Sequence, residues 1–178
     1  MKKTVYLSLG SNTGNRAENI ISALSFLQSS LFLNIKKISS FYETSPVGPR
    51  QRSFYNIAIE AQTDLKPDDL LLLVKQAEYV LGRRKTIRWG PRVVDIDILF
   101  FGREIIDEAS LTVPHKEAQN RLFVLVPLSE IAGNFVHPVL RREIRTILYD
   151  KSLTLKCQKV KIIQINIAQR DLKNRNKR

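Results

Sequence analysis

Two carboxylates stand two residues apart in a stretch whose other residues are typical of a buried β-strand. Asp95 and Asp97 alternate with Val94, Ile96 and Ile98 in the segment RWGPRVVDIDILFFG. Side chains alternate between the faces of a strand, so both carboxylates are expected on one face, roughly 6.6 Å apart along the chain. Two carboxylates that face one point repel each other unless a cation lies between them. Oxygen ligands at this spacing suit Mg²⁺, so the pair predicts a magnesium site.

Basic side chains precede the carboxylates and are expected to face the same point. The loop of residues 83–92 supplies five of them: Arg83, Arg84, Lys85, Arg88 and Arg92. Two Mg²⁺ ions that bridge a polyphosphate would leave phosphate charge for such side chains to neutralise. This interpretation predicts a phosphoryl-transfer enzyme that works mainly by positioning and charge stabilisation. The alternative is a solvated strand face whose carboxylates merely pair with neighbouring arginines.

The elements that must position these residues follow the order β-α-β-β-α-β. Apolar periodicity predicts strands over 4–9, 34–43, 54–63 and 93–101, and helices over 16–31 and 67–81. Pro67 suits the first position of the second helix, and Gly82 is placed to end it. The order indicates an α+β, ferredoxin-like core in which helices pack on an antiparallel sheet.

The pattern weakens beyond Gly102. We expect a short hairpin around 104–112, a helical piece near 118–132 that breaks at Pro127, and a helix near 141–149. The 178 residues amount to about one domain. We assign residues 1–150 to that domain and residues 151–178 to a basic C-terminal extension. Within the extension, LTLKCQKVKIIQINIA alternates enough to form one or two strands.

The net charge of +12 is concentrated in this extension. Residues 151–178 contain nine basic residues and one acidic residue, which leaves only +4 for the rest of the chain. The charge therefore says little about the domain's own chemistry. A solvated tail that aids solubility is the plain interpretation of the extension, and binding of a partner or of nucleic acid is the alternative.

Six stretches resemble the 6-hydroxymethyl-7,8-dihydropterin pyrophosphokinase family, in the family's order and rough spacing. They are LGSNTGNR (9–16), SSFYETSPVG (39–48), FYNIAIE (54–60), LGRRKTIRWGPRVVDIDILFFG (81–102), LTVPHKEAQNRLFVLVPLSEIA (111–132) and HP (137–138). The aspartate signature is the most specific of them, and the resemblance covers about residues 4–150. It implies an enzyme of folate synthesis that transfers pyrophosphate from ATP to the hydroxymethyl oxygen of the pterin and releases AMP.

The resemblance also implies roles for individual residues. Asp95 and Asp97 would hold two Mg²⁺ ions, and Arg83 and Arg92 would act with them in catalysis, with ATP as co-substrate. The pterin would be bound by Thr44, Val47, Phe54, Asn56 and Phe123. ATP would be contacted by Glu78, Lys85, Trp89, Arg92, Ile98 (through its backbone), Thr112, His115 and Arg121.

Some of these residues have a plainer interpretation without the family. Phe54 and Phe123 would be ordinary core aromatics, and His115 a structural residue of a turn. Asn56 is more informative, because it interrupts a β-favouring run and a buried amide must find partners.

The chain departs from the commoner family pattern at four positions. Lys85 stands where arginine is usual, which keeps the charge but loses bidentate phosphate geometry. Ser45 stands where proline is frequent, and Lys116 stands where an aromatic residue or proline is common. Ser110 fills a position that is basic in some members. These departures affect the detail of ATP contacts rather than the reaction.

Two other classes of protein fit parts of the pattern. An RNA-recognition motif has the same order of elements, but its aromatic strand signature is absent and the acidic pair would repel phosphate without a metal. A non-catalytic pterin- or nucleotide-binding protein would not need both the Asp95/Asp97 and the Arg83/Arg92 sets. No apolar run approaches the ~20 residues of a membrane span, and the single cysteine, Cys157, fits a reducing compartment. We therefore expect a cytoplasmic enzyme with small-molecule substrates, without a nucleic-acid or membrane partner, and favour a monomer.

Overall fold

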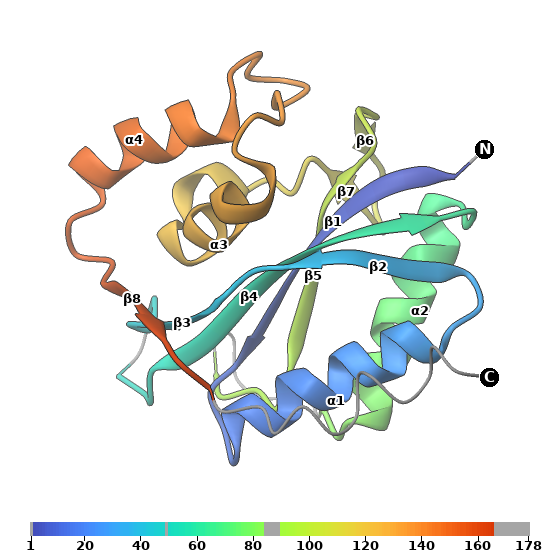
Figure 1. Ribbon diagram of the computed structural model, residues 1–178, viewed down its shortest axis with the longest axis horizontal. Helices are drawn as coiled ribbons and strands as arrows, with labels where there is room; N and C mark the ends of the chain where they lie inside the picture. Colours follow the sequence, from blue (N-terminus) through green and yellow to red (C-terminus); the bar gives the residue numbers. More distant parts are fainter. Residues whose placement is uncertain (1, 49, 84–89, 166–178) are drawn as a thin grey trace.

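A single antiparallel sheet forms the centre of the protein, which a computed structural model describes over residues 2–48, 50–83 and 90–165. Its strands run in the order β5-β1-β4-β3-β8, and β2 also pairs with β4 (Figure 1). Their bounds are β1 Lys3–Ser11, β2 Leu33–Ile38, β3 Phe41–Thr44, β4 Phe54–Thr63, β5 Asp95–Phe101 and β8 Val160–Ile163. A separate hairpin joins β6 (Ile106–Asp107) to β7 (Thr112–Val113).

Helices α1 (Arg16–Ser29) and α2 (Pro67–Val80) cover one face of the sheet (Figure 1). Strand residues such as Leu7, Ile59 and Ile96 point into this layer and are buried. The helices meet them with aliphatic side chains at helical spacing, namely Ile20, Leu24 and Leu27 from α1 and Leu70, Val74 and Ala77 from α2. Each large aliphatic side chain buried in this way stabilises the fold by about 1.5–3 kcal/mol. The predicted α+β fold, with helices packed on an antiparallel sheet, is confirmed.

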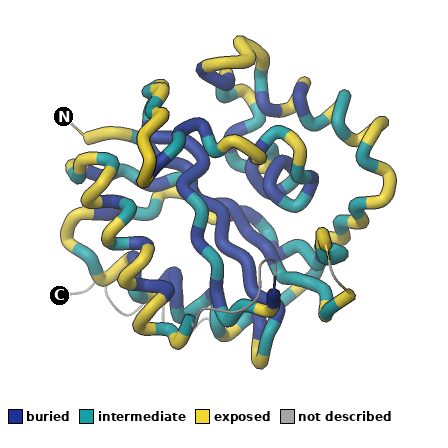
Figure 2. Tube along the Cα trace, turned by 180° about the vertical axis from the view of Figure 1, so that it is seen from behind, coloured by how far each residue is buried: buried dark blue, intermediate teal, exposed yellow. Residues whose placement is uncertain are grey.

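The opposite face is covered by α3 (Leu122–Ala132), which follows a short 3₁₀ turn at Ala118–Asn120, and α4 (Ile144–Thr154) packs on the outside of α3 (Figure 1). Val124, Leu125 and Leu128 of α3 pack on Ala58 and Phe100 of the sheet. These helices lie over one end of the strands only, and the other end runs on beyond them (Figure 2). That uncovered part of the face is where polar strand residues are found.

Two predicted elements differ from the structure. The strand expected over 34–43 is two strands, because Ser39 interrupts it: its Oγ accepts from the Ala58 N–H (2.9 Å) while its own N–H donates to the Ala58 carbonyl (2.9 Å). The break expected at Pro127 is wrong, since α3 runs through it. Buried neighbours on both sides of Pro127 hold the helix on the sheet and outweigh the missing proline N–H.

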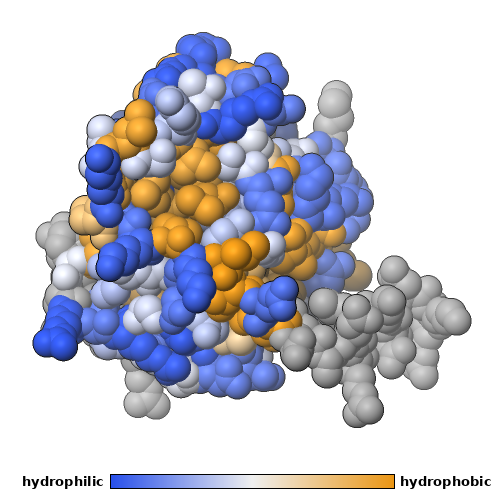
Figure 3. Space-filling model, turned by 60° about the vertical axis from the view of Figure 1, so that its left-hand side comes forward, coloured by the Kyte–Doolittle hydropathy of each residue, from blue (hydrophilic) through white to orange (hydrophobic). Residues whose placement is uncertain are grey.

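The C-terminal residues continue the domain surface. Helix α4 extends to Thr154, beyond the predicted 141–149, and β8 pairs antiparallel with β3 from Phe41↔Ile163 to Thr44↔Val160. Apolar side chains reach the surface among polar ones on this side of the molecule (Figure 3), and exposed ones on α4 and β8 include Leu153 and Ile162. Among the described residues, no helix has the length and apolar character needed to cross a membrane.

Candidate active site

Strand register brings the predicted metal and pterin residues onto one face of the sheet. Gly10 of β1 is paired with Asp95 on one side and with Asn56 on the other. Residues directly opposite in antiparallel strands point to the same face, so Asp95 and Asn56 share a face two strands apart, about 10 Å. Ser8 is likewise paired with Asp97, so Asp97 lies in the next row of that face. This is the face that α3 and α4 leave partly open.

Gly10 gives the Asn56 amide the room it occupies. A Cβ at position 10 would lie 2.7 Å from Asn56 Oδ1, which is closer than such contacts allow. Asn56 Nδ2 donates to Thr44 Oγ1 at 2.7 Å, and both side chains are buried. Phe54 is paired with Thr44 and therefore points to the same face. Three of the predicted pterin residues thus meet, while Val47 lies exposed in the loop after β3.

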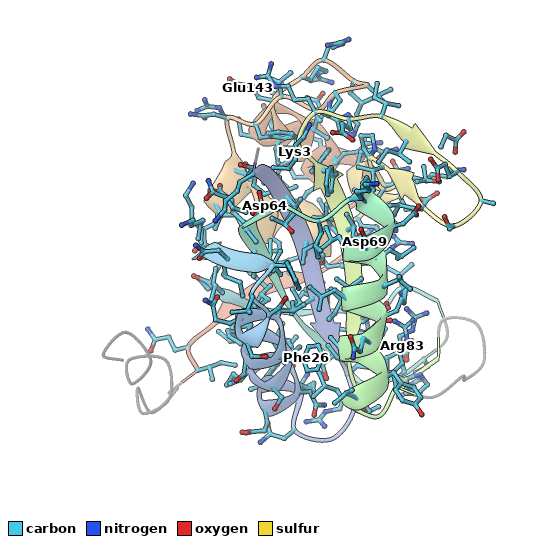
Figure 4. All side chains as sticks on the ribbon, turned by 90° about the vertical axis from the view of Figure 1, so that its right-hand side faces the viewer. Lys3, Phe26, Asp64, Asp69, Arg83 and Glu143 are labelled. Atoms are coloured by element: carbon cyan, nitrogen blue, oxygen red, sulfur yellow. The ribbon has the colours of Figure 1, made fainter. Side chains whose placement is uncertain are left out.

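Asp95 is held by two arginines. Arg83 Nη1 lies 2.6 Å from Asp95 Oδ1, and Arg92 pairs with the other carboxylate oxygen. Arg83 follows the C-terminal end of α2 (Figure 4). The predicted catalytic arginines and the first predicted metal ligand therefore form one charged cluster, about a quarter exposed to solvent.

Glu78 ties α2 to the edge strand β5. Its buried carboxylate accepts from the Ile96 N–H at 2.8 Å, and the same oxygen pairs with Arg83. The other oxygen pairs with Lys75 at 2.9 Å. The Ile96 N–H points away from β1, so Glu78 supplies the acceptor that a further strand would otherwise give. The resemblance implied ATP contact for Glu78, and the described contacts are those of a support for Arg83 and β5.

Asn12 holds Arg92 from the end of β1. Its Oδ1 accepts from the Arg92 N–H at 2.7 Å, its own N–H donates to the Arg92 carbonyl at 3.2 Å, and its Nδ2 donates to Gln51 Oε1 at 2.8 Å. Asn12 was not among the residues predicted for the site, although it lies in the stretch LGSNTGNR (9–16). Its position in GSNTGN was the available signal, but the Arg92 partner lies 80 residues away and no local pattern shows it.

Asp97 has weaker partners than Asp95. His115 Nε2 lies 4.0 Å from Asp97 Oδ2, and His115 Nδ1 accepts from the Glu117 N–H at 3.2 Å, which places the ring proton on Nε2, facing the carboxylate. Burial and the Asp95 charge raise the pKa of Asp97 above its ordinary value, while His115 and Arg121 oppose that rise. A cation beside Asp97 would stabilise its ionised form.

Three of the remaining predicted ATP residues lie on β5, on β7 and just before α3. Ile98 buries its side chain in edge strand β5, in which alternate backbone groups point outward. Thr112 lies in β7, and Arg121 precedes α3 with its guanidinium 5.7 Å from the Phe123 ring centroid. Lys85 and Trp89 lie outside the described residues.

The donor set fits a magnesium ion that takes most of its ligands from substrate and water. Within residues 2–48, 50–83 and 90–165 no group of three or more His, Cys, Asp or Glu side chains could hold a metal alone. Two carboxylates on one face are what Mg²⁺ needs when phosphates complete its shell. Both oxygens of Asp95 already face arginines, so Asp97 has more capacity left for an ion.

The fold and the cluster define an α+β domain whose acidic pair and arginines are suited to phosphate chemistry. The family model described as 7,8-dihydro-6-hydroxymethylpterin-pyrophosphokinase (HPPK) matches residues 6–133. The chain therefore belongs to the HPPK family.

Relatives and solved structures agree with this family. The 2-amino-4-hydroxy-6-hydroxymethyldihydropteridine pyrophosphokinase of Bacillus subtilis is 46% identical over 132 residues, covering 74% of this chain and 79% of the relative. The protein of the same name from Aquifex aeolicus is 40% identical over 160 residues, covering 89% and 99%.

Other relatives are longer proteins. The chain spans 38% of the bifunctional protein FolKE of Lactococcus lactis subsp. cremoris, to which it is 47% identical over 133 residues that make up 74% of this chain. The crystal structure of Plasmodium falciparum HPPK-DHPS wild type with pteroate has a TM-score of 0.71 at 17% identity. The matched region covers 88% of this chain and 45% of the Plasmodium falciparum chain, which establishes a shared fold.

Proposed function

We propose that the protein transfers pyrophosphate from ATP to 6-hydroxymethyl-7,8-dihydropterin, giving the pterin diphosphate and AMP. This is the activity of a 2-amino-4-hydroxy-6-hydroxymethyldihydropteridine diphosphokinase, a transferase of folate biosynthesis. Family membership supports it, and one observation carries it to named residues. The row Asp95–Gly10–Asn56 places a phosphate-directed cluster and a buried amide on one open face, about two strands apart.

The reaction joins the pterin hydroxyl oxygen to the β-phosphorus of ATP and breaks the bond from that phosphorus to the α,β-bridging oxygen. AMP leaves with that oxygen, and the hydroxyl proton is lost. Charge builds on the transferred group, so fixed cations nearby stabilise the transition state. Arg83 and Arg92 are those cations here, each already aligned by a carboxylate.

Asp95 and Asp97 would hold two Mg²⁺ ions. Bound Mg²⁺ supplies charge neutralisation along the triphosphate and keeps the reacting oxygens in line. Asp97 offers the less occupied carboxylate, His115 Nε2 faces it at 4.0 Å, and Arg121 adds positive charge nearby. Thr112, the Ile98 backbone and, outside the described residues, Lys85 and Trp89 remain assigned to ATP. Glu78 acts on ATP through Arg83.

The pterin is a flat ring system with donors and acceptors along its edge. Asn56 Nδ2 is used by Thr44, and within the described chain no donor reaches Asn56 Oδ1, which leaves it to accept from the pterin. Phe54 and Phe123 supply the faces for stacking. The Val47 backbone completes the edge contacts in this proposal.

The test is to mix the protein with ATP, Mg²⁺ and 6-hydroxymethyl-7,8-dihydropterin and to follow AMP. Asp97→Ala is expected to abolish AMP release while far-UV circular dichroism stays unchanged. Asp64→Ala, which removes an exposed aspartate between β4 and α2, is the matched control and should retain activity. Full turnover in Asp97→Ala would refute the metal assignment.

We further infer a monomer in the cytoplasm. All the assigned residues lie on one chain, so the proposed reaction needs no second subunit. Cys157, the only cysteine, is exposed and unpaired, as suits a reducing compartment.

A further inference from the structure

The segment of residues 155–159 contacts both sides of the proposed pterin site. It connects the end of α4 to β8 and follows the region matched by the family model, residues 6–133. On one side Gln158 reaches the start of α3: its Oε1 accepts from the Leu122 N–H at 2.8 Å and its Nε2 donates to the Asn120 carbonyl at 3.2 Å. The N-cap residue of α3, Arg121, makes no side-chain cap of its own. Gln158 therefore caps this helix from 36 residues away.

The next residue holds the end of β3. The Lys159 carbonyl accepts from the Ser45 N–H at 3.0 Å, and the Lys159 N–H donates to Ser45 Oγ at 3.1 Å. These bonds extend the β3–β8 pairing by one residue past Thr44↔Val160. Ser45 thus uses both a backbone and a side-chain group to fix the strand end that carries Thr44.

Two consecutive residues therefore tie together parts of the site that lie far apart in sequence. Phe123 and Arg121 are at the start of α3, next to the Gln158 bonds, and Thr44 adjoins the Lys159 bonds. A third contact, from Lys151 Nζ to Asn120 Oδ1 at 2.9 Å, adds to the same link. Stacking and edge contacts with a flat ligand require these two sides at a fixed separation.

We propose that Gln158 is a positioning residue for the pterin, acting through α3 and β3. This rests on the proposed pterin site. Loss of the Gln158 amide frees the first turn of α3, so the pterin meets a less ordered Phe123. The pterin KM should rise by about three- to tenfold, the scale of a lost helix cap, with kcat nearly unchanged. The KM for ATP should rise less, because Arg121 lies between the two groups that Gln158 holds.

Three variants test the proposal in AMP-release kinetics. Gln158→Ala removes both bonds, and Gln158→Glu keeps an acceptor for the Leu122 N–H and should restore most of the affinity. Gln164→Ala removes an exposed glutamine six residues further on and is the matched control. A pterin KM in Gln158→Ala equal to that of Gln164→Ala overturns the proposal, and so does an equal loss in kcat and both KM values.

Asn56→Ala, measured in parallel, separates this failure from failure of the pterin site itself. If Asn56→Ala leaves the pterin KM unchanged, the site assignment is wrong. If it raises KM while Gln158→Ala does not, only the role of Gln158 is wrong. Should Gln158→Ala fold poorly, Ser45→Ala removes only the Oγ acceptor for Lys159 and is expected to raise the pterin KM two- to threefold; no change in that variant overturns the proposal.

If residues 155–159 position the pterin site, pterin binding must in turn stabilise these residues. Cys157 lies within this segment and provides a probe of its exposure. Iodoacetamide should alkylate this exposed thiol more slowly when 6-hydroxymethyl-7,8-dihydropterin and a non-hydrolysable ATP analogue are both bound. In Gln158→Ala the protection should be lost. Equal alkylation rates of the native chain with and without the pterin overturn the coupling.

Discussion

Asp95 and Asp97 have different surroundings although they are two residues apart on one strand face. Asp95 is paired through both oxygens with Arg83 and Arg92. Asp97 has a 4.0 Å contact with His115 and lies close enough to Asp95 for that charge to raise its pKa. Asp95 thus helps to order the arginines. Asp97 carries a charge that Asp95 disfavours and that a bound cation would stabilise.

The two corresponding asparagine variants should therefore differ in stability. Asp97→Asn removes a partly buried charge that Asp95 repels, so its free energy of unfolding should stay equal or rise by less than ~1 kcal/mol while turnover falls at least ~100-fold. Asp95→Asn removes the charge that pairs with Arg83 and Arg92, leaves Arg83 with Glu78 alone, and should lower both turnover and stability. Urea unfolding and AMP release measure the two effects. A clear loss of stability in Asp97→Asn would contradict this division of roles.

Gly10 should control pterin affinity through Asn56. Gly10→Ala would place a Cβ 2.7 Å from Asn56 Oδ1, so the amide must move, and we expect the pterin KM to rise about tenfold with little change for ATP. Gly133→Ala is the matched control, because its Cβ would meet the Ser129 carbonyl at 2.8 Å, away from the site. Both variants should lose stability, but only Gly10→Ala should change KM. Equal pterin KM values in the two would count against the assignment of Asn56.

The sequence predicts residue faces better than residue partners. Alternation around Asp95 and Asp97 is a local property, and the face it predicted for both is the one observed. The bonds of Asn12 to Arg92 and of Glu78 to Ile96 join separate segments. They depend on register and helix placement, which only the assembled fold determines.

At the scale of elements, α2 and β5 are joined by one buried carboxylate. Glu78 accepts from the Ile96 N–H and pairs with Arg83 and Lys75. The helix thereby fixes the edge strand that carries both aspartates. A change at Glu78 should therefore affect the site without touching substrate.

Glu78→Gln should separate the hydrogen bond from the charge. The amide oxygen still accepts from the Ile96 N–H, but Arg83 and Lys75 each lose their ion pair with Glu78. Because both cations keep some contact with solvent, we expect a cost of about 1 kcal/mol in stability, together with about tenfold lower kcat/KM for ATP as Arg83 becomes less ordered. Glu143→Gln, which breaks an exposed pair with Arg145, should change neither beyond ~0.5 kcal/mol. Identical behaviour of the two variants would remove Glu78 from the site.

Element existence was predictable and element boundaries were less so. Long apolar periodicities predicted α1, α2 and β4 at nearly their observed places. Both differences depend on contacts with the sheet. Ser39 bonds to Ala58, and α3 continues through Pro127 because its side chains are buried against the sheet. Local propensity cannot include such contacts.

At the scale of the whole molecule, an aromatic cluster joins the sheet to the connection between α3 and α4. It lies at the core that α3 and α4 form with the sheet. Phe135 lies 5.0 Å from Tyr6 and 4.9 Å from Phe100, centroid to centroid, and the His137 ring lies edge-on to Phe100 at 5.2 Å. His137 Nδ1 accepts from the Val139 and Leu140 N–H groups, both at 3.2 Å. The buried ring is therefore held as the neutral, Nε2-protonated form.

Acid should weaken the fold through His137. Burial lowers its pKa below the ordinary value of 6.5, so as the pH falls below 6.5 the unfolded chain takes up a proton before the folded chain does. Stability is therefore fully present above pH 6.5 and declines below it, by at most about 1.4 kcal/mol per pH unit, until the folded-state pKa is reached. Urea unfolding at pH 7.5, 6.5 and 5.5 should show this slope in the native chain and a smaller slope in His137→Asn. Asparagine retains an acceptor for the two N–H groups but does not titrate. A slope in His137→Asn equal to that of the native chain would assign the acid sensitivity to other groups.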